Sequence, residues 1–336
     1  MADEHQLPLF IEHIIGAYAV LLLGLGRSTG LLPALLEGTG TPDEIAARAG
    51  VDPCNALEWL RGMTSAGYAV HDGGTFRPAD AASMTFGPQF PVDATAVLDG
   101  YMAIPQVYEA LVAAIGTGGG LSAEQLAPYA PFVAVNTPTY EMALVDEWIG
   151  GIPGLRETLA GGASVAELAP GNGAAAAVLG RAFPASTFVG FDIQPRPLPD
   201  LPPNVRIEAA DARAVPADGF ELVYIFDSLH HISDSDAVLA SVRQSLAPGG
   251  VVLVAENDFT GDLDQDSANP FSTIAYTSSL MYCLQEALHG GGDTHTCAEG
   301  SEWIVGGLAK AGFHDVQVRH SPTGYALVSG VVRAPI

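Results

Sequence analysis

The chain has 336 residues, of which 48% are hydrophobic, enough for one large domain or two ordinary ones with packed cores. Its formal net charge is −25, from 13 basic and 38 acidic side chains. Such a surface repels nucleic-acid phosphates and anionic membranes, so it disfavours those partners and suits neutral or cationic small molecules. A generally acidic proteome would produce the same charge.

The cysteines give no disulfide framework or zinc motif, because they are far apart or lack CxxC spacing: Cys54, Cys283 and Cys297. A reducing, cytoplasmic location fits this usage best. The acidic start, with Asp3 and Glu4, is unlike a signal peptide.

The first helix is expected over residues 7–25, which are apolar nearly all round and therefore typical of a helix buried on several sides. Its most apolar stretch, residues 14–26, is shorter than the roughly 20 residues that span a bilayer. Residues 41–44, Thr-Pro-Asp-Glu, predict a helix start with a capping box, and Gly50 ends that helix.

A second capped helix is expected from Asp52 and Pro53, with an inward face formed by Leu57, Leu60 and Met63 and with Trp59 at its edge. Residues 68–76 then predict a hairpin around the turn Asp-Gly-Gly at 72–74. Helix, turn, helix and hairpin form a winged-helix pattern over residues 1–90. Ten acidic residues against four arginines give about −6, which disfavours DNA and favours a dimerisation domain.

The remainder divides into a helical part, residues 91–160, and an alternating part, residues 161–336. The helical part is broken at 116–120 and near Pro128 and Pro131, and is expected to link the domains and roof the active site. Strands are expected at 165–168, 187–191, 205–209, 222–226 and 251–255, with a C-terminal antiparallel pair at 315–319 and 324–332. Strands alternating with helices predict an α/β fold with a parallel, Rossmann-like sheet.

A glycine-containing turn follows the first of these strands, in the run Glu-Leu-Ala-Pro-Gly-Asn-Gly at residues 167–173. Glycines let a backbone approach a ligand closely, and the alanine-rich helix that follows would present free N–H groups. Only Gly171 and Gly173 of a dinucleotide G-x-G-x-x-G pattern are present. The next strands end in Asp192, suited to ribose hydroxyls, and in Asp211, suited to an exocyclic amine.

This order of strand ends resembles class I S-adenosylmethionine (SAM)-dependent methyltransferases over residues 160–335. The resemblance implies SAM as cofactor and a site made of Glu167, Ala169, Gly171, Asn172, Gly173, Asp192, Ile193, Asp211, Ala212 and Asp227. One departure is Ala169, which stands where the family usually has its first glycine and whose methyl group would crowd the methionine end of SAM.

A second segment runs from Phe226 to Glu256 and contains Leu-His-His at 229–231 and Leu-Ala-Pro-Gly-Gly at 246–250. It resembles small-molecule O-methyltransferases of the plant caffeate type and their bacterial relatives, which carry an N-terminal winged-helix dimerisation domain. The resemblance implies that His230 is the general base and Glu256 its partner, with His231 as a third catalytic residue where the family has aspartate. Imidazole titrates near neutral pH, which suits a base.

Three functions remain open for the sequence. The first is SAM-dependent methylation of an oxygen in a small, natural-product-like acceptor of secondary metabolism, by a cytoplasmic homodimer that binds neither nucleic acid nor membrane. The second is iron-assisted C-methylation of an α-keto acid, using His230, His231, His289 and His295, although no spacing assigns a metal ligand. The third is a related fold that catalyses a rearrangement or cyclisation, or only binds.

Overall fold

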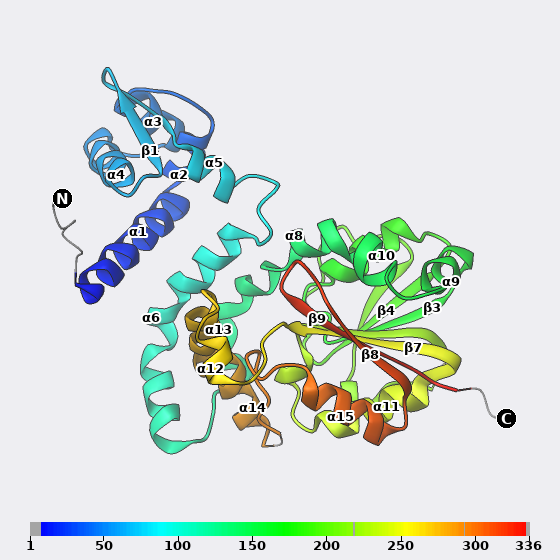
Figure 1. The fold of residues 1–336 in the computed structure, drawn as a ribbon. Helices are drawn as coiled ribbons and strands as arrows, with labels where there is room; N and C mark the ends of the chain where they lie inside the picture. Colours follow the sequence, from blue (N-terminus) through cyan, green and yellow to red (C-terminus); the bar gives the residue numbers. More distant parts are fainter. Residues whose placement is uncertain (1–7, 218, 292, 334–336) are drawn as a thin grey trace, which may run out of the picture. The chain divides into compact units, whose positions relative to one another are not determined.

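The structure is a computed structural model, and it describes residues 8–217, 219–291 and 293–333 (Figure 1). The chain forms two compact units. The N-terminal unit comprises Met1–Pro105 and Tyr129–Pro138, and the catalytic unit comprises Gln106–Pro128 and Thr139–Ile336. Each unit is described by itself.

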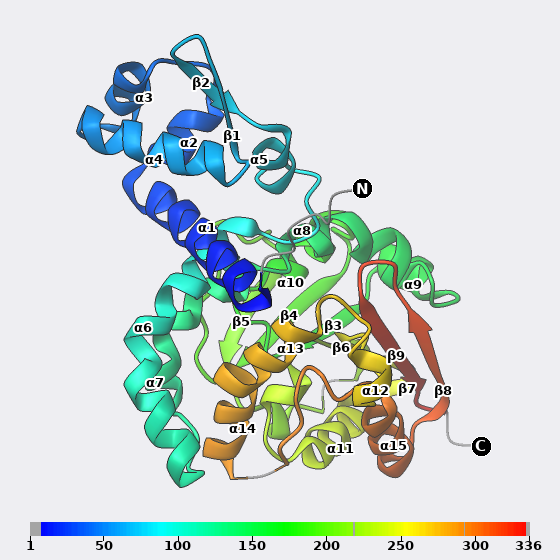
Figure 2. The ribbon, with the colours of Figure 1, turned by 60° about the vertical axis from the view of Figure 1, so that its left-hand side comes forward.

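The N-terminal unit is built from short helices and one hairpin, as the sequence predicts (Figure 2). Thr41 and Glu44 form the predicted capping box, and Gly50 ends that helix with φ of 70°. The elements are α1 (Leu9–Thr29), α2 (Leu31–Leu36), α3 (Pro42–Ala49), α4 (Pro53–Ser65), β1 (Ala69–Asp72), β2 (Thr75–Pro78) and α5 (Asp80–Thr85).

The position of Trp59 on α4 differs from the prediction. Its side chain is buried rather than at the edge, and its indole N–H donates to the Leu22 carbonyl at 2.8 Å. Leu57, predicted to point inward, is only half-buried. The indole can be buried because its one polar atom, Nε1, has a hydrogen-bond partner inside the unit.

Helix α1 corrects a second prediction. Most of its apolar side chains are exposed in the chain taken alone, including Phe10 at 70% and Tyr18 at 65%. The helix has 21 residues, and its most apolar 18-residue window has a mean hydropathy of 1.9, so it is long and apolar enough to cross a membrane by length and composition. The expectation of a helix buried on several sides therefore does not hold within the single chain, and the expectation that its apolar stretch is too short to span a bilayer is wrong by length and composition.

The predicted helical region follows, with breaks near the expected glycines and prolines. It contains α6 (Ala94–Thr117), α7 (Ala123–Leu126), the 3-10 helix η1 (Ala127–Ala134), α8 (Thr137–Thr139), the π-helix η2 (Tyr140–Ile149) and α9 (Leu155–Gly161). Pro131 lies inside η1, where a tight 3-10 geometry replaces the α-helix.

The catalytic unit contains a seven-stranded sheet of order β5-β4-β3-β6-β7-β9-β8. The first five strands in this order are parallel to one another. β9 pairs antiparallel with β7, and β8 pairs antiparallel with β9. This arrangement confirms the predicted α/β class. The strands are β3 (Ser164–Leu168), β4 (Thr187–Asp192), β5 (Val205–Ala209), β6 (Phe220–Phe226), β7 (Leu246–Asn257), β8 (His314–His320) and β9 (Tyr325–Val331).

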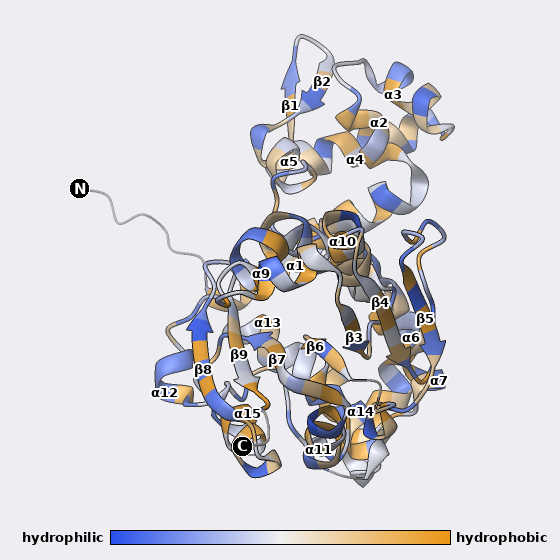
Figure 3. Ribbon diagram, turned by 90° about the vertical axis from the view of Figure 1, so that its right-hand side faces the viewer, coloured by the Kyte–Doolittle hydropathy of each residue, from blue (hydrophilic) through white to orange (hydrophobic). Residues whose placement is uncertain are grey.

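Helices cover both faces of this sheet (Figure 1). One core packs η2, α9 and α10 (Ala174–Ala182) against it, and the other packs α11 (Ser235–Ser245) and α15 (Glu302–Ala311). At the outer edge, β8 alternates hydrophilic and hydrophobic residues, as Figure 3 shows. This pattern is typical of an edge strand with one solvated face.

The register of the parallel strands brings their carboxyl ends to one edge of the sheet. Leu168 pairs with Phe191, and Asp192 with Ala209. Beside them, Phe226 pairs with Ala255. Short elements extend from this region: η3 (Ala212–Ala214), η4 (Leu229–His231), α12 (Leu263–Asp266), α13 (Ser272–Ser278), η5 (Ser279–Cys283) and α14 (Leu284–Gly290). Ligands bind at this edge in open α/β sheets.

Candidate active site

The glycine turn connects β3 to α10 and depends on two left-handed glycines, Gly171 with φ of 58° and Gly173 with φ of 79°. A Cβ atom at Gly173 would lie 2.5 Å from Ile207 Cδ1, the end of a side chain that can shift, so this position requires glycine for its conformation rather than for space. Asn172 Oδ1 accepts a hydrogen bond at 3.0 Å from the N–H of Ala174, the first residue of α10, and so satisfies one free N–H at the start of this helix.

Ala169 has φ of 50°, which places an alanine in the left-handed region at the end of β3. Asp227, at the end of β6, has φ of 49°. Aspartate tolerates this region better than alanine does, because its short polar side chain forms local hydrogen bonds. Ala169, which departs from the family pattern in the sequence, therefore also has a strained backbone at the expected cofactor turn.

Replacing Ala169 by glycine is expected to stabilise the fold by about 0.5–1 kcal/mol, because relief of the left-handed strain exceeds the entropy cost of glycine. Thermal unfolding monitored by circular dichroism measures the change. Ala166→Gly is the control: Ala166 lies within β3, three residues before Ala169, is fully buried and has no positive φ, and its substitution is expected to destabilise. A lower melting temperature for Ala169→Gly would contradict the assignment of strain.

Asp192 lies half-buried at the end of β4, and its carboxylate connects two loops. Oδ2 accepts the Gly171 N–H at 3.2 Å, and Oδ1 accepts the Gln194 N–H at 2.7 Å. A carboxylate has about four acceptor positions, so both oxygens can still accept further hydrogen bonds. The next side chain, Ile193, is 69% exposed and offers an apolar surface beside that carboxylate.

Asp211 is the N-cap of η3 and forms two side-chain hydrogen bonds to Arg213 Nε in addition to an ion pair with its Nη2 at 2.6 Å. The Arg213 hydrogen bonds hold the pKa of Asp211 below its usual value. Ala212, the neighbouring residue, is buried. The carboxylate predicted to contact a nucleobase amine is therefore already held by an arginine.

Glu167 lies beneath the glycine turn rather than on its surface, with 4% of its area exposed. Its Oε2 accepts the Tyr224 hydroxyl at 3.0 Å, and its carboxyl also accepts the Ala176 N–H. Burial raises its pKa to about 8. These bonds connect β3, β6 and α10, so Glu167 positions the turn.

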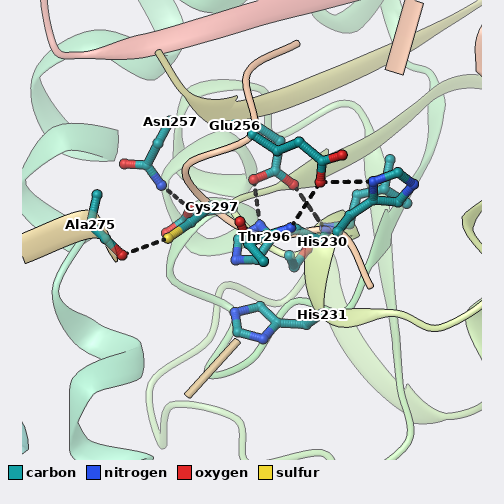
Figure 4. Close-up of polar contacts among 12 residues, drawn as sticks. His230, His231, Glu256, Asn257, Ala275, Thr296 and Cys297 are labelled. Atoms are coloured by element: carbon teal, nitrogen blue, oxygen red, sulfur yellow. Dashed lines mark hydrogen bonds and ion pairs between the residues drawn. The ribbon is translucent and has the colours of Figure 1, made fainter. Parts of the chain in front are cut away.

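His230 and Glu256 form a buried pair between η4 and the end of β7 (Figure 4). His230 Nδ1 donates to Glu256 Oε2 at 2.5 Å, and the two side chains are 2% and 4% exposed. Glu256 Oε1 accepts the backbone N–H groups of Leu229 and His230 at 3.0 and 3.3 Å. These bonds fix the carboxylate. Nε2, the other ring nitrogen of His230, does not bond to Glu256.

Two opposing effects set the pKa of His230. Burial lowers it, but the Glu256 carboxylate, through its charge and its hydrogen bond, raises it further, to about 9. The imidazolium is therefore the stable form near neutral pH, and the neutral form that accepts a proton becomes dominant only above that value.

His231 forms a second histidine–glutamate pair beside the first. Its Nδ1 lies 2.9 Å from Glu286 Oε2 on α14, and its ring centroid lies 4.2 Å from that of His230. Burial acts to raise the pKa of Glu286, but the neighbouring His231 and His230 together lower it below its usual value. Tyr282 contacts the His231 ring edge-on, with centroids 5.0 Å apart.

Sequence reasoning missed Glu286, Tyr282 and Asn257, although all three contact predicted site residues. Asn257 donates from Nδ2 to Asp227 Oδ1 at 2.8 Å. Position alone could have suggested Asn257, because it follows Glu256 at the end of a strand. Nothing local marks Glu286 or Tyr282, which reach the site through the packing of α14 against η4 and of η5 against α14.

The structure separates the two remaining histidines of the sequence-based cluster. His289 is exposed on α14, and His295 forms an ion pair with Glu299 at 2.9 Å and stacks on Trp303 with centroids 3.8 Å apart. Among the described residues, the groups able to share a metal ion combine His230 with His231 and Cys283, or with Asp227 and Glu256. Neither includes His289 or His295.

Parts of this chain are similar to known methyltransferases. Residues 140–299 match the family model described as a methyltransferase domain. The methyltransferase str2 of Strobilurus tenacellus is 31% identical over 98 residues, which are 28% of this chain and 36% of that protein. The matched segment thus spans about a third of that relative. The tetracenomycin polyketide synthesis 8-O-methyl transferase TcmO of Streptomyces glaucescens is 25% identical over 308 residues, covering 84% of each chain.

Solved structures agree on the fold. Human N-acetylserotonin methyltransferase in complex with SAM superposes with a TM-score of 0.72 at 16% identity, covering 99% of this chain and 100% of that one. Similarity at this identity shows that the two chains share one fold over nearly their whole length.

Proposed function

We propose that this chain, which carries a methyltransferase domain over residues 140–299, transfers a methyl group from SAM to an oxygen atom of a small-molecule acceptor. The observation that carries the proposal is the buried His230–Glu256 pair, with 2.5 Å between Nδ1 and Oε2. It lies at the same edge of the sheet as the glycine turn and Asp192, so a base and a nucleoside site are adjacent.

The residues of the turn suit the nucleoside of SAM. Asp192 has free acceptor positions for ribose hydroxyls, and Ile193 offers an apolar surface for the adenine ring. The backbone around Gly171, Asn172 and Gly173 lets a ligand approach closely. Asp211 and Ala212 border the adenine edge, and Asp227 the methionine end, where an acidic side chain suits a cationic ligand. Glu167 and Ala169 support the turn from below.

The reaction requires alignment and one proton transfer. Bound SAM supplies an electrophilic methyl group on a sulfonium. The acceptor oxygen attacks that carbon in line, the carbon–sulfur bond breaks, and His230 Nε2 takes the hydroxyl proton. Glu256 holds Nδ1–H, which keeps Nε2 in the accepting tautomer and stabilises the imidazolium that forms. His231 contacts the acceptor from the adjacent pair. Positioning of the two reactants contributes most of the rate.

The raised pKa of His230 decides how costly that proton transfer is. A phenol has a pKa near that of tyrosine, about 10, so transfer to an imidazole of ordinary pKa near 6.5 would cost about 5 kcal/mol. With the pKa of His230 at about 9, the cost of transfer to the neutral ring falls to about 1.4 kcal/mol, and that neutral ring dominates above this pH. Glu256 thus makes a phenolic or similarly acidic hydroxyl the acceptor that this site deprotonates best.

Incubation with methyl-labelled SAM and a panel of phenolic polyketide-like acceptors tests the activity. The panel is chosen because TcmO is named as a polyketide 8-O-methyl transferase. We expect labelled product carrying the methyl group on oxygen, identified by mass spectrometry and NMR. Label on carbon, or none on any acceptor although the product nucleoside binds, would contradict O-methylation.

We further propose that residues 1–90 form a winged-helix-like domain that builds a homodimer of a cytoplasmic enzyme. The exposed apolar side chains of α1, among them Phe10, Ile15 and Tyr18, support an interface with a second copy. Light scattering is expected to give twice the monomer mass of 34.7 kDa, and Ile15→Glu to give the monomer. Glu12→Gln, on the same helix, is the control. A monomer for the unmodified chain would refute the dimer, and lipid-dependent solubility would indicate a membrane role for α1.

A further inference from the structure

Two buried thiols lie beside the paired histidines. Cys283 ends η5 and is 4% exposed, and its thiol hydrogen-bonds to Cys297 in the loop before α15. Cys297 Sγ also lies 3.5 Å from the Ala275 carbonyl oxygen (Figure 4). Two of the three cysteines in the chain therefore converge on the site, although methyl transfer as proposed uses neither.

Three potential ligand atoms form a compact group there. One atom from each of His230, His231 and Cys283 lies within 4.8 Å of the others. Tetrahedral zinc takes nitrogen at about 2.0–2.1 Å and sulfur at about 2.3 Å, so its ligand atoms lie roughly 3.3–3.8 Å apart. Small side-chain rotations would close the group around such an ion.

The surroundings of both histidines match those of metal ligands. A histidine that binds a metal usually gives its other ring nitrogen to a carboxylate, which orients the ring and makes it a better ligand. Glu256 Oε2 accepts a hydrogen bond from His230 Nδ1 at 2.5 Å, and Glu286 Oε2 lies 2.9 Å from His231 Nδ1. Nε2 of each ring is thus the nitrogen available to an ion. Binding of a cation would release the Cys283 thiol proton to solvent, and the resulting thiolate beside two imidazoles would select a soft or borderline cation rather than magnesium or calcium.

We propose that His230, His231 and Cys283 bind a thiophilic divalent cation, zinc, and that this binding inhibits methyl transfer. Zinc on His230 Nε2 occupies the nitrogen that receives the acceptor proton. Inhibition, but not metal binding, rests on the proposed function. The site differs from a four-histidine cluster, because its third ligand is a thiolate and it excludes His289 and His295.

Cobalt(II) titration tests the binding without any activity assay. Metal-free protein, kept reduced with a phosphine, is titrated with Co²⁺ and read for a thiolate-to-cobalt charge-transfer band in the near ultraviolet. We expect one equivalent to give the band and zinc to displace it. Cys283→Ser is expected to abolish the band and His231→Gln to weaken Co²⁺ affinity at least about tenfold. Two independent ligand variants are used, each checked for folding by circular dichroism.

Cys54→Ser and His289→Ala are the matched controls, because both residues are exposed and outside the group. Each should leave the band unchanged. No band in the unmodified protein, or a band that persists in folded Cys283→Ser, would overturn the site. Methyl transfer is then measured with and without one equivalent of Zn²⁺. A band without inhibition would keep the metal site and contradict His230 as the base, so the two proposals fail separately.

Discussion

His230→Ala is expected to lower kcat about 10²–10⁴-fold, the usual cost of losing a general base. Affinity for S-adenosylhomocysteine should change less than about twofold, because the imidazole serves the acceptor and forms none of the hydrogen bonds that order the glycine turn. Steady-state kinetics and calorimetry on the same preparation measure the two quantities.

His289→Ala is the matched control, since this histidine is exposed on α14 and outside the site. It should retain full turnover. Normal turnover of folded His230→Ala would show that the buried imidazole is structural. Equal damage from both substitutions would point instead to a site that includes the C-terminal histidines.

Glu256→Gln is expected to have the second-largest effect, about 10²–10⁴-fold on kcat, because it changes the tautomer of His230. The new amide N–H₂ can donate to Nδ1, which places the ring proton on Nε2 and removes its lone pair from the acceptor. The remaining amide oxygen can still accept the Leu229 N–H, so the local fold is expected to persist.

The pH at which the methyl-transfer rate rises should also differ between the unmodified enzyme and Glu256→Gln. Only neutral His230 accepts a proton, and its pKa is raised to about 9, so the rate of the unmodified enzyme should rise with pH through that value. Without the Glu256 charge, the pKa of His230 should fall, because burial lowers it and Glu256 is the largest of the groups that raise it, so the rise should move to lower pH. Glu286→Gln, which alters the neighbouring pair, is the control and should leave an alkaline rise. An unchanged profile in Glu256→Gln would show that another group limits the rate.

The sequence predicts the sheet well, because its strands are short β-rich runs separated by helical segments and glycine turns. The β5 bounds, 205–209, agree with the prediction to the residue. β7 is longer than predicted, since its start at Leu246 pairs with Phe220 across an irregularity that no local pattern reveals. The parallel order then places His230 and Glu256 close together, as the motif resemblance implies.

Features set by tertiary packing were beyond the sequence. Periodicity shows that α1 is apolar, but not whether its cover comes from the same chain, and the structure leaves it exposed. The burial of Glu167 under Tyr224 and the approach of Glu286 to His231 depend on contacts between residues far apart in the chain. The left-handed φ of Ala169 is likewise a property of the folded turn.

Calorimetry with S-adenosylhomocysteine, the product nucleoside of methyl transfer, tests the SAM site most directly. We expect one site per chain, with affinity at least about tenfold weaker in Asp192→Ala, since loss of even one charge-assisted hydrogen bond costs about 1.5–3 kcal/mol. Asp264→Ala, an exposed carboxylate on α12, should bind as the unmodified protein does. No binding to the folded, unmodified protein, or equal binding by Asp192→Ala, would contradict a SAM site at the carboxyl ends of β3 and β4.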